Sequence, residues 1–352
     1  EEEKQAIPQK ASTIHRLLKP LPPSIHFRQN QKHPLQTDFV IIDEASMVDL
    51  PLMAKLMDAI PQDCRLLLVG DVDQLAPVEA GSPFASIIRY FQRPERPQLV
   101  AKLSTSRRFG QASSIHQLCQ SITRGDSAGV DQLLSAGNHL DLEFSETTQK
   151  EEIDRLILRG YESLQLAKTP EEALKSFLEF QVLCPSHHGE RGVIAMNERI
   201  HSLVSKNLVV KNTRFSGMPI IIKQNDYSSG LFNGDIGIFL PKNEHSQELT
   251  VWFANSDGSL RNLSPARLPE YDLAYAITIH RSQGSEYKNV FLLMPENKSE
   301  VLSRHLLYVA CSRAKEKVFI HGNKNLILET IEKATLYSQS LENRMYELCE
   351  VH

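Results

Sequence analysis

Two short runs of apolar residues near the amino-terminal end of the sequence stop abruptly at acidic residues. The first run is FVIIDEASM (39–47) and the second is LLLVGDVDQL (66–75). An apolar run without polar alternation is typical of a strand that is buried on both faces of a parallel sheet. Ligands bind at the carboxyl ends of such strands. We therefore expect Asp43, Glu44 and Asp71 to lie at one ligand-binding edge of a sheet.

Apolar residues at helical or alternating spacing, with Gly or Pro at the boundaries, predict further elements in the first 215 residues. Asp49 and Pro51 are typical of the start of a helix, as are Thr169 and Pro170. The alternation of strands with helices predicts parallel sheets with helices packed on them. Helices are expected at 10–18, 51–60, 81–91, 111–124, 150–166, 170–179 and 190–206, strands at 39–43, 64–69, 99–103 and 180–186, and loops at 19–37 and 125–148.

The pattern changes from about residue 216 to residue 269. Short β runs are joined there by turn signals such as Asn233-Gly234, which predicts a small all-β insertion of about the size of an SH3 barrel. The α/β rhythm then returns, with helices at 274–284 and 301–313, strands at 289–294 and 317–322, and a terminal helix. The expected domains are 1–104 for a first lobe, 105–215 with 270–352 for a second, and 216–269 for the insertion.

Charge and cysteine content narrow the class of protein. The net charge is −4, so any binding of nucleic acid requires a local groove rather than a global basic field. Five scattered cysteines without a CxxC pair argue for reduced thiols in a cytoplasmic protein and against a zinc site or disulfide framework. No run reaches the roughly 18 apolar residues that a membrane-spanning helix needs.

Three further motifs give meaning to the acidic runs. TIHRSQGSE (278–286) forms a compact polar cluster, YVACSRAKEKV (308–318) places Arg313 near the end of a helix and before a strand, and TSRRFG (105–110) contains Arg108. In chain order, DEAS, GDVDQL, RRF, TIHRSQGSE and YVACSRA resemble motifs II to VI of the superfamily 1 helicases. Together with NDYSSGLFNGDIGI (225–238) they are similar to the RecD-type branch, and most of all to its exodeoxyribonuclease V alpha subunits.

This resemblance covers residues 11 to 322 and implies an α/β fold of two RecA-like P-loop NTPase lobes. In the family, ATP binds in the cleft between the lobes and single-stranded DNA runs across both. The resemblance also implies an ATP-dependent 5′→3′ DNA helicase with ATP and Mg²⁺ as cofactors. Its partners would be DNA ends and the beta and gamma subunits of exodeoxyribonuclease V, and its role would be double-strand-break repair and recombination.

The resemblance implies a role for each matching residue. Asp43 would hold Mg²⁺ through water and Glu44 would activate a water molecule, while Gln74 would sense the γ-phosphate. Arg108 and Arg313 would be arginine fingers. The implied nucleotide-side residues are Asp71, Gly284 and Glu286, and the implied DNA-contacting residues are Thr13, His15, Thr278 and His280.

Each of these assignments competes with a structural interpretation. The Asp43–Glu44 pair could cap the following helix, Arg108 could lie on a solvated surface, and His15 and His280 could be packed structural residues. His187 and His188 suggest a surface turn rather than a metal site. Trp252 and Phe253 could stack on bases, although the core of the β insertion is the more ordinary place for at least one of them.

One motif of the family is missing. The sequence contains no Gly-Lys dipeptide, and so it lacks the G-x-x-x-x-G-K-[ST] loop that holds the phosphates. We therefore expect a fragment that starts within a truncated first lobe, exposes a sheet edge, binds ATP weakly and does not hydrolyse it alone. The rival hypotheses are a stand-alone RecD-like helicase and a non-catalytic DNA-binding scaffold subunit.

Overall fold

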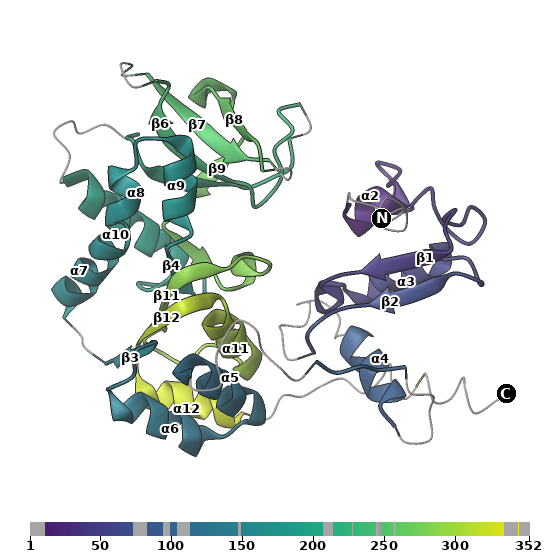
Figure 1. The fold of residues 1–352 in the computed structure, drawn as a ribbon, viewed down its shortest axis with the longest axis horizontal. Helices are drawn as coiled ribbons and strands as arrows, with labels where there is room; N and C mark the ends of the chain where they lie inside the picture. Colours follow the sequence, from purple (N-terminus) through teal and green to yellow (C-terminus); the bar gives the residue numbers. More distant parts are fainter. Residues whose placement is uncertain are drawn as a thin grey trace, which may run out of the picture. The chain divides into compact units, whose positions relative to one another are not determined.

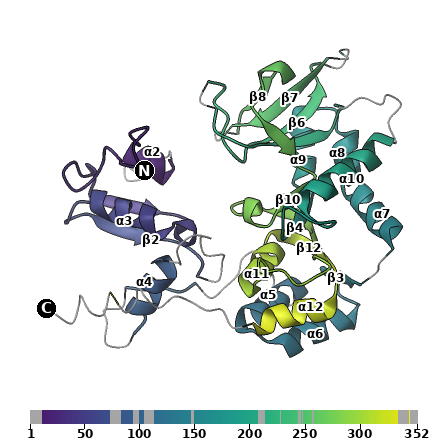
Figure 2. The same cartoon turned by 180° about the vertical axis from the view of Figure 1, so that it is seen from behind.

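The computed structural model describes residues 11–72, 83–93, 99–103, 113–146, 149–206, 214–226, 228–243, 246, 248–255, 258–333 and 344. These residues divide into two compact units, one within residues 1–103 and 336–352 and one within residues 104–335 (Figures 1 and 2). None of the described helices is both long enough and apolar enough to cross a membrane.

The first unit is built on a two-stranded parallel sheet, β1–β2, whose register runs from Phe39 opposite Arg65 to Ile42 opposite Leu68. The predicted start of the helix after β1 is confirmed, because the Asp49 carboxylate accepts a hydrogen bond of 2.7 Å from the amide of Leu52. The elements are α2 (Ile14–Leu18), β1 (Phe39–Ile42), the 3-10 turn η1 (Ala45–Met47), α3 (Leu50–Ala59), β2 (Arg65–Leu68) and α4 (Pro83–Phe91).

Strand β1 alternates between a buried and an exposed face. Val40 and Ile42 pack into a core with Leu56 of α3, whereas the side chains of Phe39 and Ile41 are 51% and 57% exposed. The prediction of a strand buried on both faces is therefore wrong for β1. The physical reason is that α3 covers only one face of this short sheet.

The second unit contains a five-stranded, all-parallel sheet in the order β10-β4-β11-β12-β3. Strand β4, which lies between β10 and β11, is buried along its whole length. The strands are β3 (Leu142–Ser145), β4 (Phe180–Cys184), β10 (Ala276–Thr278), β11 (Tyr287–Leu293) and β12 (Ala314–His321).

Helices pack around this sheet in two groups (Figure 1). The first group contains α5 (Ser114–Arg124), α6 (Ser127–Ala136), α11 (Arg304–Ser312) and α12 (Lys324–Glu332). The second contains α7 (Lys150–Gly160), α8 (Glu162–Leu166), α9 (Pro170–Phe177) and α10 (Val193–Lys206). The predicted start of α9 is confirmed, and Thr169 and Glu172 form a complete capping box there.

The expected β insertion is a five-stranded antiparallel sheet in the order β8-β7-β6-β5-β9. Its strands are β5 (Met218–Ile222), β6 (Ile236–Pro241), β7 (Leu249–Ala254), β8 (Leu260–Leu263) and β9 (Tyr271–Leu273). Within the described residues no ladder joins β8 to β9, and closure into an SH3-like barrel stays a prediction.

Three local predictions are wrong. Residues 125–148 are not a loop, because Asp126 caps α6, Gly137 ends it in a left-handed conformation, and β3 follows. Residues 274–284 are not a helix but the strand β10 followed by the 3-10 turn η3 (His280–Ser282). Residues 99–103 form no strand, and their two leucines, Leu99 and Leu103, are exposed rather than packed in a core.

Candidate functional site

The acidic edge predicted from the sequence lies at the carboxyl ends of β1 and β2. The amide of Val69 donates to the carbonyl of Ile42, and the amide of Ala45 donates to the carbonyl of Val69, both at 2.8 Å. These bonds continue the pairing beyond the two strands. They hold the exposed Asp43, and Glu44 after it, beside the segment that leads to Asp71.

Glu44 has an unusual backbone conformation. Its φ of 52° and ψ of 39° lie in the left-handed region, which costs a side-chain-bearing residue roughly 1–2 kcal/mol. Among the described non-glycine residues, only Lys19 shares a positive φ. The Glu44 side chain makes no capping hydrogen bond to η1, so the helix-capping interpretation does not account for this carboxylate. Strained backbone of this kind clusters at functional sites.

The implied DNA-contacting residues of the first unit lie on α2. Thr13 caps this helix by accepting a hydrogen bond of 3.3 Å from the amide of Arg16. His15 packs edge-on against the ring of Phe27 at a centroid distance of 5.7 Å, and both Thr13 and His15 are exposed. Gln74 and Arg108 lie outside the described residues.

The cluster 278–286 lies where β10 leaves the parallel sheet of the second unit. Thr278 is buried, and its hydroxyl accepts a hydrogen bond of 3.2 Å from the amide of Arg281. Burial, and next the neighbouring His187, lower the pKa of His280. His280 is thereby neutral at pH 7, and it lies near a second imidazole at the carboxyl ends of β10 and β4.

The metal interpretation of the adjacent histidines finds no support in the geometry. In the part of the chain that the structure describes, no group of three or more His, Cys, Asp or Glu side chains could hold a metal ion. His187 and His188 lie in the loop between β4 and α10, as the turn interpretation expects.

The implied nucleotide-side residues of the second unit lie together. Arg313 is 4% exposed, and its guanidinium donates at 3.3 Å to the carbonyls of Val309 and Ser285. Gly284 adopts a left-handed φ of +75° with open space around it. Glu286 forms an ion pair of 3.1 Å with Lys315. The turn after β10 and the end of α11 are thus joined within one unit.

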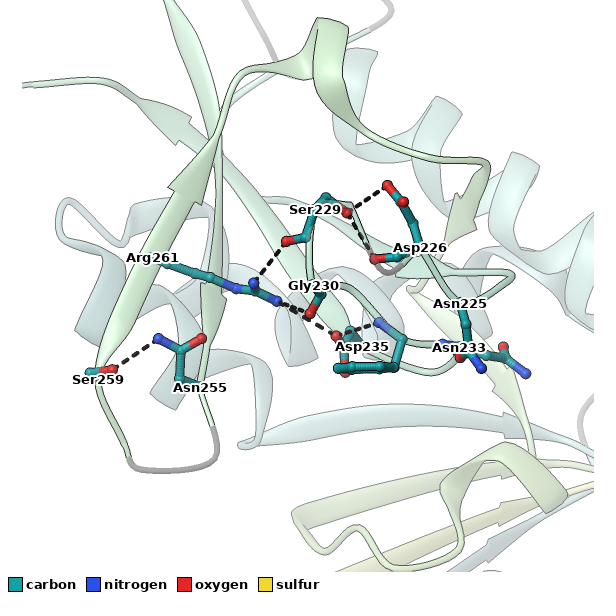
Figure 3. A network of polar contacts seen from close by, with 10 residues as sticks. Asn225, Asp226, Ser229, Gly230, Asn233, Asp235, Asn255, Ser259 and Arg261 are labelled. Atoms are coloured by element: carbon teal, nitrogen blue, oxygen red, sulfur yellow. Dashed lines mark hydrogen bonds and ion pairs between the residues drawn. The ribbon is translucent and has the colours of Figure 1, made fainter. Parts of the chain in front are cut away.

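A polar network in the β insertion was missed by sequence reasoning (Figure 3). Arg261 of β8 donates to the carbonyls of Ser229 and Gly230 at 3.0 and 2.8 Å and lies 3.9 Å from the Asp235 carboxylate. It thereby fixes the loop between β5 and β6, which is the stretch that resembles the RecD-type branch. Phe253, also on Arg261's side of the sheet, is buried as expected. An isolated arginine in a β run gives no signal for such a contact.

Comparisons with known proteins identify the class of this fold. A family model described as "AAA domain" matches residues 3–140, and one described as "UvrD-like helicase C-terminal domain" matches residues 273–321. Bacteroides Pif1 bound to single-stranded DNA has a similar structure, with a TM-score of 0.51 and 16% identity over 96% of this chain and 84% of that one. At this identity the likeness shows the fold alone. It supports a RecA-like α/β architecture.

Sequence relatives give the family within that class. The chain is 33% identical over 341 residues to the RecBCD enzyme subunit RecD of Mycobacterium tuberculosis, covering 95% of this chain and 58% of the relative. It is 30% identical over 402 residues to that subunit of Haemophilus influenzae, covering 96% and 60%. The ATP-dependent RecD2 DNA helicase of Deinococcus radiodurans is 31% identical over 318 residues, covering 89% and 40%.

The chain belongs to the RecD-like family of superfamily 1 helicases. It spans about three-fifths of the length of the RecD relatives named here.

Proposed function

We propose that this chain is the motor part of an ATP-dependent 5′→3′ DNA helicase that acts as a subunit of exodeoxyribonuclease V in double-strand-break repair and recombination. The observation that carries the proposal is the gathering of the expected motif residues within each unit. Asp43 and Glu44 lie beside the segment leading to Asp71 in one unit, and Arg313 contacts the segment after Gly284 in the other.

The chemistry of the acidic edge suits a nucleotide with Mg²⁺. Carboxylate oxygens are preferred ligands of this ion, which usually keeps several waters, and Asp43 presents an exposed carboxylate at the end of β1. When bound, Mg²⁺ would neutralise charge on the β- and γ-phosphates. Asp43 would hold it through water, Asp71 would contact the nucleotide, and Glu44 would orient or deprotonate the attacking water.

Arginines would supply the remaining positive charge. An arginine finger raises the rate of phosphoryl transfer by roughly 10³–10⁵-fold, and we assign this role to Arg108 and Arg313, with Gln74 sensing the γ-phosphate. Gly284 and Glu286 would contact the nucleotide. The hydrogen bonds of Arg313 to backbone carbonyls keep its guanidinium in one orientation, which lowers the entropy lost when it meets an anion.

Residues that are distinct from the nucleotide-contacting ones would bind DNA. The proposed contacts with single-stranded DNA are Thr13 and His15 at the start of α2, Thr278 at the end of β10, and His280 after it. We propose that residues 1–104 are the first RecA-like lobe, that 105–215 with 270–352 are the second, and that 216–269 are its insertion. Alternating closure of the two lobes on ATP would then move the protein along the strand.

The subunit assignment has its own test. We propose a cytoplasmic complex with beta and gamma subunits, since the RecD relatives are named as RecBCD subunits. Co-purification of those subunits with the tagged intact protein supports this, and their absence favours a stand-alone RecD-like helicase.

We also propose that the present chain alone binds ATP weakly and does not hydrolyse it, because no Gly-Lys phosphate loop is present. Micromolar ATP affinity with turnover by this chain would refute that.

The catalytic test is Glu44→Gln in the intact protein. The matched control is Asp58→Asn, which also removes one carboxylate but on the exposed side of α3. Loss of one catalytic group costs about 10²–10⁴-fold in rate, so Glu44→Gln should lose DNA-stimulated ATP hydrolysis while still binding single-stranded DNA. Asp58→Asn should match the wild type. An unchanged rate in Glu44→Gln would favour the scaffold alternative.

A further inference from the structure

Residues 271–278 belong to two sheets at once. Strand β9 pairs antiparallel with β5 of the insertion, and the amide of Ala274 continues this pairing by donating to the carbonyl of Pro219 at 3.0 Å. Strand β10 then pairs parallel with β4 of the five-stranded sheet. Only Ala274 and Tyr275 separate the two strands. We call residues 274–276 the junction.

A side chain replaces the missing neighbour of β10. Among the described residues, this strand lies at the edge of its sheet and pairs with β4 alone. On helix α10, Asn197 accepts a hydrogen bond from the amide of Ala276 at 2.9 Å and donates one to its carbonyl at 2.8 Å. The side-chain carboxamide of Asn197 thus makes the two hydrogen bonds that the backbone of an adjacent strand would make, and it covers the edge of β10 at Ala276.

Two other buried polar side chains hold the junction from the side of β4. Gln181 is fully buried and donates to the carbonyl of Tyr275 at 2.8 Å. The Tyr161 hydroxyl donates to the same carbonyl. Burial raises the pKa of Tyr161 well above its ordinary value, so this hydroxyl remains a donor. The carbonyl of Tyr275 therefore receives two side-chain donors.

Packing alone does not explain an asparagine at this position. The neighbouring core-facing residues of α10, Met196, Ile200 and Val204, are all apolar. A buried amide without partners costs about 1–3 kcal/mol, so a polar residue at position 197 is favourable only because it bonds the junction. Thr278 and His280 follow Ala276 by two and four residues, and a shift of the junction must displace them.

We propose that Asn197, assisted by Gln181 and Tyr161, is a positioning residue that sets the orientation of Thr278 and His280 toward single-stranded DNA. This inference rests on the proposed function. In this proposal, helix α10 keeps Thr278 and His280 in a fixed position relative to the β insertion.

The experiment uses the intact protein with Asn197→Ala and the milder Tyr161→Phe, which removes only the hydroxyl. Asn289→Ala is the matched control, because Asn289 also donates a side-chain hydrogen bond to a backbone carbonyl, that of Glu179 at 3.1 Å, but at the start of β11. The assay measures the concentration of single-stranded DNA that half-maximally stimulates ATP hydrolysis, the rate at saturating DNA, and hydrogen exchange of the junction.

The expected result separates binding of DNA from turnover. Asn197→Ala should raise the half-maximal DNA concentration about tenfold, equal to ~1.4 kcal/mol, and Tyr161→Phe about threefold. The rate at saturating DNA should stay within about twofold, and exchange should quicken at 274–280 only. Because Asn197 acts in part through His280, the loss in the double variant Asn197→Ala/His280→Ala should be smaller than the sum of the two single losses.

Two outcomes are distinguishable failures. If His280→Ala raises the half-maximal DNA concentration but Asn197→Ala and Tyr161→Phe behave like Asn289→Ala, this inference is overturned and the proposed function stands. Full additivity of Asn197→Ala with His280→Ala has the same meaning. If the wild type itself shows no DNA-stimulated hydrolysis, the proposed function is overturned, and the inference with it.

Discussion

The left-handed backbone of Glu44 leads to a prediction about stability that is independent of any assay of activity. Glycine adopts this conformation without steric cost, so Glu44→Gly should relieve the strain at the end of β1. The Glu44 side chain makes no capping bond to η1, and so this replacement removes no local cap. Asn, which tolerates the left-handed region, should be neutral or slightly stabilising, whereas the β-branched Val should be destabilising.

The magnitude follows from two opposing terms. A side-chain-bearing residue loses roughly 1–2 kcal/mol in the left-handed region, and at φ 52° and ψ 39° Glu44 is close to the centre of that region. Glycine offsets about 0.5–1 kcal/mol of the gain through its greater freedom in the unfolded chain. The net expectation for Glu44→Gly is a stabilisation of about 0.5–1 kcal/mol, or roughly two- to fivefold in an equilibrium constant.

Native-state hydrogen exchange of peptides within residues 39–60 measures this change directly. Exchange should slow by roughly two- to fivefold in Glu44→Gly. Lys19→Gly is the matched control, since Lys19 has a φ of 58° and ends α2. It should stabilise α2 similarly while leaving ATP hydrolysis by the intact protein unchanged. Equal or faster exchange in Glu44→Gly, with slower exchange in Lys19→Gly, would refute the reasoning.

Two further predictions concern the second unit. Replacing Arg261 by Ala removes its hydrogen bonds to Ser229 and Gly230. Hydrogen exchange of the loop 225–235 should then quicken at least tenfold, since bonds from a charged donor contribute about 1.5–3 kcal/mol. Arg261→Lys should restore little of the protection, because lysine lacks the planar, pre-organised fork whose two nitrogens bond the two carbonyls, and a slow-exchanging loop in Arg261→Ala would contradict this. Burial, and next the charge of Arg191, lower the pKa of His321 to about 4. The folded state thus disfavours the protonated ring, so stability is full above the unfolded pKa of about 6.5 and falls by at most about 3 kcal/mol as the pH drops toward the folded value. Urea midpoints from pH 7.5 to 4 measure this slope, which His321→Gln should reduce; an identical slope in the variant would exclude His321 as its source.

Local chemistry allowed several features to be predicted from sequence. The caps at Asp49 and Thr169 depend on side chains within three residues of the helix start, so they can be read without a fold. The carboxylates after β1 were also predictable, because an apolar run that ends in Asp43 and Glu44 has few other uses. The left-handed φ of Glu44 carries no sequence signal.

Features that depend on distant partners could not be predicted. The apolar run AYAIT at 274–278 fits either a helix or a strand, and the ladder with β4 decides the outcome. Asn197 bonds a residue 79 positions away, and Arg261 bonds a loop about 30 positions away. Neither side chain is distinguishable in sequence from an ordinary surface residue. Gly137 ends a helix, but a glycine within a polar stretch is equally typical of a loop.

The hydrogen bond between Ala274 and Pro219 brings the entry and exit of the five-stranded insertion side by side. Segments whose ends nearly touch are tolerated as additions or removals within a host domain. The β insertion therefore has the geometry of a segment that can be added to or removed from its host domain. A gene in which two or three glycines replace it should encode a protein whose parallel sheet still forms, because the two ends of the host chain already lie beside each other.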